Sequence, residues 1–536
     1  MAKRGSSVSC KRATVVLLCC GSLSLACLAP AAAAPSEEAQ AASASPPPPP
    51  PSSPAAKQAE PAKKPPDLPP GVKQVDHDPK LFRPDPSYQD KPYDPVAQEQ
   101  IYGGKHLNKT ARPWVEAGRH QYEPGSYDPA YTWFGDLNLA TPAAMAFGDL
   151  RTAAAYNDNG VPNAKGVSHQ ATVATRLNLD LDLGLTATER LHMFVRPFDK
   201  DGSFLRYDID GKRTGFGGDV NFIPKTLFFE GDLGPISEGL SGRVNKLDLP
   251  FAVGLVPLFT QNGIWIDDAF LGGAFTIPAR NSRALGISNM DLTFFTALDQ
   301  VTTPAVKSAA GVLANHGTHI YGFSGFVDAD RGYWEFGYGY VDASLDRLSY
   351  HNLTVAFTRR YRAIFSNSVR VITNLGQNPL PGVQKTADGT LVLIESSLIS
   401  RRPLTLVPYL NLFAGFDKPQ ALARAADAGG VLKNVGINFE TDGLTGFPLL
   451  DDRGSDSYGG ALGLEYLFNL DRQIVVEVAT VQRSKTVPGL GAQYALGVRF
   501  QQPLDNAWIL RMDAMRGFQE VGRDTVGVRV EIRRKF

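Results

Sequence analysis

The feature that most constrains the fold is a stretch of strict alternation at residues 171–185. The odd-numbered positions from Val173 to Leu185 are apolar apart from one threonine, and the even-numbered positions include Arg176, Asp180 and Asp182. A period of two is typical of a β-strand whose two faces meet different surroundings. At roughly 3.3 Å per residue the strand is more than about 40 Å long, whereas strands of globular proteins have about 5–6 residues. A strand of this length favours the wall of a large barrel.

The same alternation recurs along the rest of the chain, for example at residues 333–340, 491–500 and 525–533. Short turns and long connections alternate between these segments. The predicted short turns are 186–189, 234–238, 328–331, 359–362, 400–403, 470–472 and 502–506, and the predicted long connections are 157–169, 199–224, 300–317, 374–390 and 417–456. Outer-membrane barrels show this asymmetry between short periplasmic turns and long external loops.

The sequence therefore predicts an all-β fold, a transmembrane antiparallel up-and-down β-barrel of about 18 strands (16–20). Long strands with an apolar face in lipid must close on themselves, because open edges leave backbone groups unsatisfied. The predicted strands are 146–156, 170–185, 189–198, 225–233, 239–257, 268–279, 290–299, 318–327, 332–343, 352–358, 363–373, 391–398, 403–416, 457–468, 472–483, 491–500, 505–516 and 523–536.

Residues 1–34 are expected to be a secretory signal peptide, with a basic start, an apolar core and a run of small residues. A retained anchor helix is the alternative, although the apolar core is short for a bilayer span of about 20 residues. All four cysteines lie in this segment, so cleavage leaves no disulfide, thiolate metal site or cysteine nucleophile. Cys27 follows a sequence that loosely resembles a lipoprotein cleavage box, which leaves lipidation open.

Residues 35–70 are rich in Ala and Pro and poor in large apolar side chains, so we expect a disordered tether. Residues 71–145 are expected to form an irregular periplasmic segment or a plug for the barrel, which occupies residues 146–536. The whole chain has a formal net charge of zero, so charge gives no reason to expect a nucleic-acid partner.

Two local features resemble known families. The terminal Phe536, on the apolar parity of its strand, resembles the C-terminal aromatic signature of bacterial outer-membrane proteins. That resemblance implies a porin-type barrel assembled by the barrel-insertion machinery. Residues 242–251 resemble a strand of the phosphate-selective porin type, a 16-stranded family, and this likeness implies the porin class without any binding residue.

Ionisable side chains on the polar parity of the strands are the candidates for lining a water-filled pore. The candidates are Arg176, Asp180, Asp182, Arg190, Arg196, Arg206, Arg213, Arg499, Arg511 and Arg529, with His192, Arg360, Arg370, Glu465, Glu477, Asp513 and Glu531 on the same parity. The alternative is that most of these side chains only form a solvated or mutually paired wall. Both signs of charge occur, so weak ion selectivity is expected.

Residues 199–224 are expected to form a charged loop that either stays in solvent or folds inward to narrow the pore. The loop carries seven charged residues, including Arg206 and Arg213, and the sequence 208–211 resembles half of a calcium loop. His316 and His319 lie three residues apart in another connection, where catalysis or metal binding is the minor alternative to a structural role. No catalytic motif, metal motif or cofactor-binding motif was found, so no catalytic residue, metal or cofactor is predicted.

The predicted function is passive diffusion of small hydrophilic solutes or ions across the outer membrane, with outer-membrane lipids as surroundings. The alternative is a structural or plugged barrel that acts as a surface anchor or interaction protein. A barrel-borne hydrolase, the third class considered, has no supporting residues. The sequence does not distinguish a homotrimer from a monomer.

Overall fold

The structure is a computed structural model that describes residues 113–118, 130–160, 168–200, 203–210, 214–218, 220–308, 311–398, 406–440, 443–468, 472–486 and 489–536. All of them belong to one compact unit, Lys91–Phe536. The predictions for residues 1–34 and 35–70, and for most of 71–145, lie outside the described residues.

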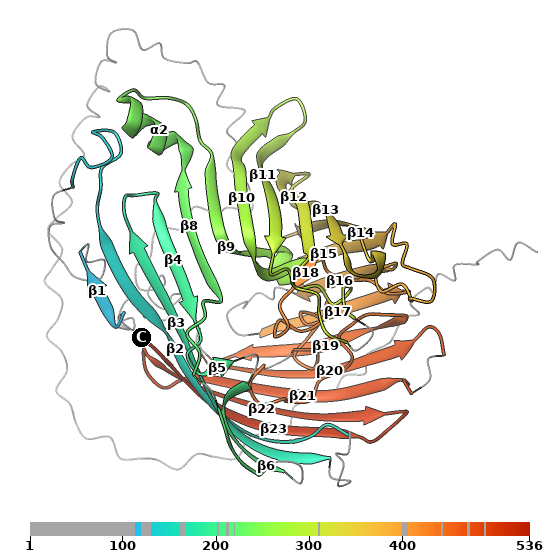
Figure 1. Cartoon of the computed structure of the whole chain (residues 1–536). Helices are drawn as coiled ribbons and strands as arrows, with labels where there is room; N and C mark the ends of the chain where they lie inside the picture. Colours follow the sequence, from blue (N-terminus) through green and yellow to red (C-terminus); the bar gives the residue numbers. More distant parts are fainter. Residues whose placement is uncertain are drawn as a thin grey trace, which may run out of the picture. The chain divides into compact units, whose positions relative to one another are not determined.

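The described residues form a closed antiparallel β-barrel of 18 strands (Figure 1). Each wall strand pairs with the next, and the last strand returns to pair with the first, so that Ala154 lies opposite Val530. The wall strands are β2 (Ala143–Asp158), β3 (His169–Gly184), β4 (Arg190–Val195), β8 (Thr226–Asp232), β9 (Pro250–Thr260), β10 (Ile266–Ser282), β11 (Ile287–Asp299), β12 (Thr318–Ala329), β13 (Gly332–Ala343), β14 (Tyr350–Tyr361), β15 (Phe365–Leu375), β16 (Thr390–Leu398), β17 (Leu406–Phe416), β19 (Ser457–Leu467), β20 (Gln473–Arg483), β21 (Gln493–Pro503), β22 (Trp508–Gln519) and β23 (Thr525–Lys535). The predicted fold class and strand number are confirmed.

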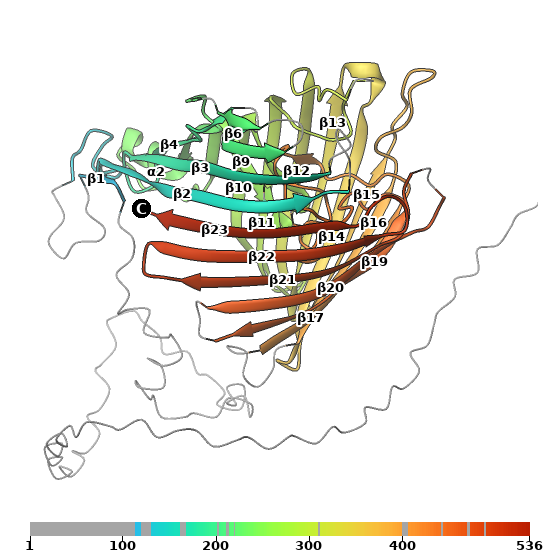
Figure 2. The ribbon, with the colours of Figure 1, turned by 90° about the horizontal axis from the view of Figure 1, so that it is seen from below.

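The two faces of the wall strands differ as the alternation predicts. On β3, Val173 and Leu183 are exposed on the outside of the barrel, whereas Arg176 and Asp182 are buried inside it. The strands run side by side around the wall (Figure 2). The outward side chains are largely apolar, which suits a wall that faces lipid. Among the described residues, no helix is both long enough and apolar enough to cross a membrane.

The prediction that residues 199–224 form a loop is wrong. β4 pairs with one half of β3, and β6 (Ser203–Asp210) pairs with the other half, so the two together complete one long wall strand. The short strands β5 (Asp199–Lys200) and β7 (Gly215–Gly217) pair with β6. The charged composition concealed a period of two in which Leu205, Tyr207 and Ile209 alternate with Arg206 and Asp208.

The prediction of one strand over 239–257, preceded by a turn at 234–238, is also wrong. The segment begins with the helix α2 (Leu233–Ser241), and β9 starts only at Pro250. The side chain of Asp232 caps the helix by accepting a hydrogen bond from the Gly234 amide at 2.7 Å. Gly242 ends it in the left-handed conformation, φ 65°, which favours glycine. The segment 242–251 that resembles a porin strand is therefore mostly a loop.

The described part of residues 71–145 lies next to the first and last wall strands. β1 (Val115–Ala117) pairs with Ala144–Ala146 of β2. The Trp114 ring stacks on the ring of the C-terminal Phe536 at 3.5 Å between centroids. The segment 130–141 is joined to the β3–β4 turn by a hydrogen bond from the Asn138 amide to Glu189 at 2.9 Å.

Candidate functional site

The long connection between β17 and β19, residues 417–456, folds into the interior of the barrel. Its short strand β18 (Ala423–Arg424) pairs in parallel with Ile266 and Asp267 of β10. The buried guanidinium of Arg424 donates hydrogen bonds to the carbonyl oxygens of Gly263, Ile264, Ala428 and Gly429. The bonds to Gly263 and Ile264 fix the connection to the turn between β9 and β10. We call residues 417–456 the inner segment.

An apolar core holds the inner segment against the wall strands from β10 to β22. Leu422, Leu432 and Phe439 of this segment are buried together with Trp265 and Phe413 from the wall. The Trp265 indole N–H donates to the Asn352 side chain at 2.8 Å, so its polar atom is satisfied inside the core. Parts of two other long connections join the same core, including Val301, Val306 and Ala387. The interior along these strands is therefore filled with packed side chains.

Polar contacts also hold the inner segment to β20 and β2. The Glu477 carboxylate on β20 accepts hydrogen bonds from the backbone amides of Ile437 and Asn438 at 2.9 and 3.0 Å, and from the Tyr409 hydroxyl. The Asn157 amide donates to the carbonyl oxygen of Thr445 at 2.9 Å. The inner segment therefore bridges the barrel from β10 to β20.

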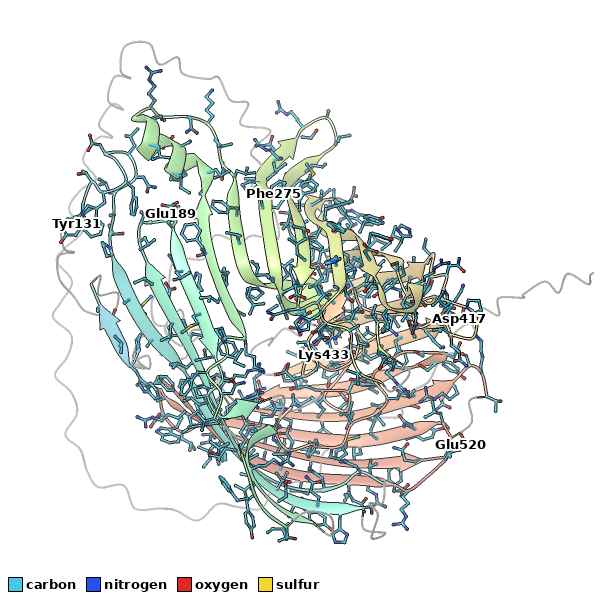
Figure 3. All side chains as sticks on the ribbon, viewed as in Figure 1. Tyr131, Glu189, Phe275, Asp417, Lys433 and Glu520 are labelled. Atoms are coloured by element: carbon cyan, nitrogen blue, oxygen red, sulfur yellow. The ribbon has the colours of Figure 1, made fainter. Side chains whose placement is uncertain are left out.

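A cavity of about 1990 Å³ remains between the inner segment and the wall. Figure 3 labels Lys433, which lies within the ring of strands and forms an ion pair with Asp267. The charged residues that line the cavity are Arg151, Arg176, Arg196, Lys225, Lys433, Arg511, Arg533 and Lys535, and Asp199, Asp267, Asp268, Glu395, Asp427, Glu440 and Glu531. The lining thus contains eight basic and seven acidic side chains, so its positive and negative charges nearly balance.

Two carboxylates of the inner segment face arginines of the wall. Asp427 forms ion pairs with Arg196 and, at 3.9 Å, with Arg176. Glu440 forms ion pairs with Arg499 at 2.6 Å and with Arg511 at 3.4 Å. Salt bridges therefore join the inner segment to the wall at two points, and Asp427, Glu440, Arg176, Arg196 and Arg511 also line the cavity.

The pKa values of these two carboxyls follow from the same contacts. Burial alone would raise the pKa of Asp427, but the charges of Arg196 and Arg176 outweigh it and hold the pKa below its ordinary value. Burial likewise opposes ionisation of Glu440, and the charges of Arg499 and Arg511 lower its pKa. Both groups are therefore carboxylates at neutral pH.

The wall arginines are further joined by acidic residues of β22 and β23. Asp513 pairs with Arg499 at 2.7 Å, with Arg511 at 2.9 Å and with Arg529 at 3.3 Å. Glu531 pairs with Arg151 at 2.8 Å and also with Arg529. This network fixes the arginine side chains, so their positions along the cavity are set before any solute arrives.

The structure brings together about half of the residues predicted to line a pore. Arg176, Arg196 and Arg511 line the cavity, while Arg499 and Arg529 belong to the ion-pair network beside it. Asp182 and Arg190 form a separate cluster with His192 and Glu230 nearer the turn end of the barrel, and Asp180 lies on the same parity of β3 as Asp182. Arg206 pairs with Asp208 on β6 and does not line the cavity, and Arg213 lies outside the described residues.

The other residues singled out in the sequence lie at different places in the structure. Arg370 is buried between Glu335 and Glu395, and Glu477 binds the inner segment. His316 pairs with Asp299, and His319 contacts the carbonyl oxygen of Leu298. In the part of the chain that the structure describes, no group of three or more His, Cys, Asp or Glu side chains could hold a metal ion.

Sequence reasoning missed Arg151, Asp427 and Glu440. Arg151 lies on the polar parity of the predicted strand 146–156, so the same rule could have found it. The other two lie in 417–456, which was predicted only to be a long external connection. A signal was present, because Leu432, Val435 and Phe439 are large apolar residues that a solvated loop does not need.

No protein-family model matches the sequence, and no curated protein matches it. Solved structures with a similar fold come from Pseudomonas aeruginosa. They include OpdO (10% identity, TM-score 0.45, covering 73% of this chain and 97% of that one) and OccK5, also called OpdH (12% identity, TM-score 0.46, 73% and 98%). A third is OccK2, also called OpdF, in complex with glucuronate (11% identity, TM-score 0.47, 73% and 98%). The barrel fold of this chain follows from its strand pairing and does not depend on these likenesses.

Proposed function

We propose that this chain is an outer-membrane channel for passive diffusion of small hydrophilic solutes or ions. The observation that carries the proposal is the charged cavity of about 1990 Å³ inside a closed barrel whose outer wall is apolar. A barrel of about this strand number leaves an aqueous channel. Charged side chains along such a channel keep it wet and set which ions pass.

The inner segment is the element that narrows this channel. Its apolar core fills the interior along the wall from β10 to β22, so a solute has to pass through the cavity lined by Arg176, Arg196, Arg511, Asp427 and Glu440. The near balance of charges supports weak ion selectivity. The constriction is therefore proposed to lie at the inner segment. Of residues 199–224, β6 belongs to the wall, while Asp199, Ile223 and Pro224 border the cavity.

Assembly of the barrel is proposed to depend on the terminal Phe536. Its backbone is paired to Gly148 through two hydrogen bonds, at 2.9 and 3.1 Å, so the C-terminus is built into the seam between β23 and β2. We expect recognition of this end by the barrel-insertion machinery. Chemical cross-linking of the purified protein would decide between a homotrimer and a monomer.

A liposome-swelling assay tests the function. Liposomes that contain the purified protein should swell in isotonic solutions of small sugars, and they should not swell with a polymer too large for the barrel. Protein-free liposomes and liposomes with heat-denatured protein are the controls. Folded protein that admits no sugar would contradict the channel and would favour a plugged barrel that acts as a surface anchor or interaction protein.

A further inference from the structure

An apolar groove lies on the outer wall of the barrel, beside the connection that contains α2. Its volume is about 450 Å³. Rings of Phe251, Phe275 and Phe294 form its sides, and Gly273 lies between them on β10. Leu233 and Leu249 lie at the two ends of the α2 connection. They form the rim of the groove at the end of the barrel where the short turns lie. Figure 3 labels Phe275 on β10, apart from Lys433 in the interior.

The groove opens toward the surroundings of the barrel and not toward its cavity. Val253, Leu271 and Phe275 share one parity of β9 and β10 and are exposed, whereas Phe270 and Ala297 point inward and are buried in the core. Phe295 also borders the groove, although its ring is buried in the core. Gly273 is on the outward parity. A Cβ atom added there would contact only the Ala252 carbonyl oxygen within 4 Å, at 3.2 Å, so the space above this glycine is open.

The α2 connection combines exposed apolar and basic side chains. Leu240 is 83% exposed and Val244 78% exposed, and the basic residues Arg243 and Lys246 lie in the same short stretch. Such a mixture is typical of segments that lie in the interface of a bilayer. Of the acids in this connection, Glu238 accepts a hydrogen bond from the Asn245 amide within the connection, while Asp248 is exposed.

The wall above the groove carries further aromatic rings. Phe229 approaches Phe251 at 6.0 Å, and Phe294 approaches both Phe275 at 5.2 Å and Phe323 at 6.1 Å between centroids. Aromatic girdles on barrels lie where the apolar band meets the headgroup region. The groove therefore lies where a lipid can place its chain on the wall and its headgroup beside the connection.

We propose that this groove is a binding site for one phospholipid, with an acyl chain over Gly273 and the phosphate near Arg243 and Lys246. This inference requires that the barrel spans a membrane, but it does not require that the barrel conducts. The apolar lining recognises the chain, and the two cations recognise the phosphate. A second copy of the protein is the competing occupant, and it is distinguished below.

The test compares lipid retention by the purified full-length protein and by variants that fill the groove. Detergent-solubilised protein is mixed with phosphatidylglycerol or phosphatidylethanolamine, and bound lipid is counted by native mass spectrometry. Gly273→Phe places a ring over the floor of the groove, and Thr296→Phe does so from the paired position on β11. Leu271→Phe is the matched control, because it adds a ring to the same outward face of β10 without lining the groove.

The expected result is one retained phospholipid for the natural sequence and for Leu271→Phe, with retention about tenfold lower for either groove-filling variant. Heat-modifiable migration on gels shows which variants are folded, so failure of one groove-filling variant to fold leaves the other as the test. Equal retention by a folded groove-filling variant overturns the proposal. A lipid-free dimer that Gly273→Phe dissociates also overturns it, in favour of a second copy.

The headgroup is tested separately with Arg243→Gln combined with Lys246→Gln. Weaker retention of both lipids, with phosphatidylglycerol affected more, supports the placement of the phosphate, and unchanged retention contradicts it. Channel measurements keep the two proposals apart. If the protein retains lipid but does not conduct, only the channel proposal is refuted. If it conducts without retaining lipid, only the lipid-site proposal is refuted.

Discussion

Neutralising the two carboxylates of the inner segment should make the channel selective for anions. The double variant Asp427→Asn and Glu440→Gln changes the charged lining of the cavity from eight basic and seven acidic residues to eight basic and five acidic. It also removes the segment's counter-charges from Arg176, Arg196, Arg499 and Arg511. An anion that passes these arginines then meets less compensated positive charge.

The size of the effect follows from the contact distances. Two unit charges about 4 Å apart interact by about 1 kcal/mol when water screens them fully, and by more in a narrow passage. Each removed carboxylate should therefore change the relative permeability of anions over cations by roughly fivefold. Salt screens such charges over about 8–10 Å, so the effect should shrink at high ionic strength.

The assay is the reversal potential of reconstituted channels across a potassium chloride gradient. Glu520→Gln is the matched control, because Glu520 is an exposed acid that does not line the cavity (Figure 3). The double variant should shift the reversal potential toward that of chloride, and the control should not. An unchanged potential, or a shift toward potassium, would refute the assignment of the passage to this side of the inner segment.

Three further predictions follow from the faces, the core and the pKa values. Leu179→Arg should reduce the folded fraction on gels far more than Asp180→Arg, because a charge on the lipid face costs roughly 2–4 kcal/mol near the midplane and the inner face is wet. Equal folding of the two variants would refute the assignment of the outer and inner faces of β3. Trp265→Ala should lower the free energy of unfolding by about 3–5 kcal/mol, because it empties a fully buried site and leaves Asn352 without its indole partner. Denaturant titration measures the free energy of unfolding, with the outward Trp334→Ala as control. Similar losses in both variants would contradict the role of Trp265 in the apolar core. Because the pKa values of Asp427 and Glu440 are lowered, their contribution to holding the inner segment is complete above the ordinary carboxyl pKa and is lost as the pH falls through the lowered values. The difference in ion selectivity between the natural sequence and the Asp427→Asn, Glu440→Gln variant should therefore stay constant from pH 8 to about 5 and shrink only below about 4; a difference that disappears near pH 6 would contradict these ion pairs.

The wall of the barrel could be predicted from the sequence because its cause is local. Lipid on one side and water or packed core on the other impose a period of two on every strand, and strands such as β3 and β13 show it over most of their length. Two exceptions have local causes as well. In α2 the apolar residues Leu233, Ile236 and Leu240 follow a helical spacing too short to stand out, and in β6 the acids concealed the alternation.

The candidate site could be predicted only in part because its decisive contacts are distant in sequence. Arg424 binds the carbonyl oxygen of Gly263, 161 residues earlier, and Asp427 pairs with Arg196, 231 residues earlier. Periodicity predicts the side of the wall on which Arg176 lies, but it carries no information about which connection meets that side chain. The apolar residues of 417–456 were the one sequence signal that this connection folds inward.

Single-channel recording of the purified protein in planar lipid bilayers tests the central claim most directly. The cavity between the inner segment and the arginine-bearing wall predicts discrete, reproducible current steps, and deletion of the central part of the inner segment should enlarge them. Protein that is shown to be folded and inserted, but that carries no current either with or without the inner segment, would contradict the channel.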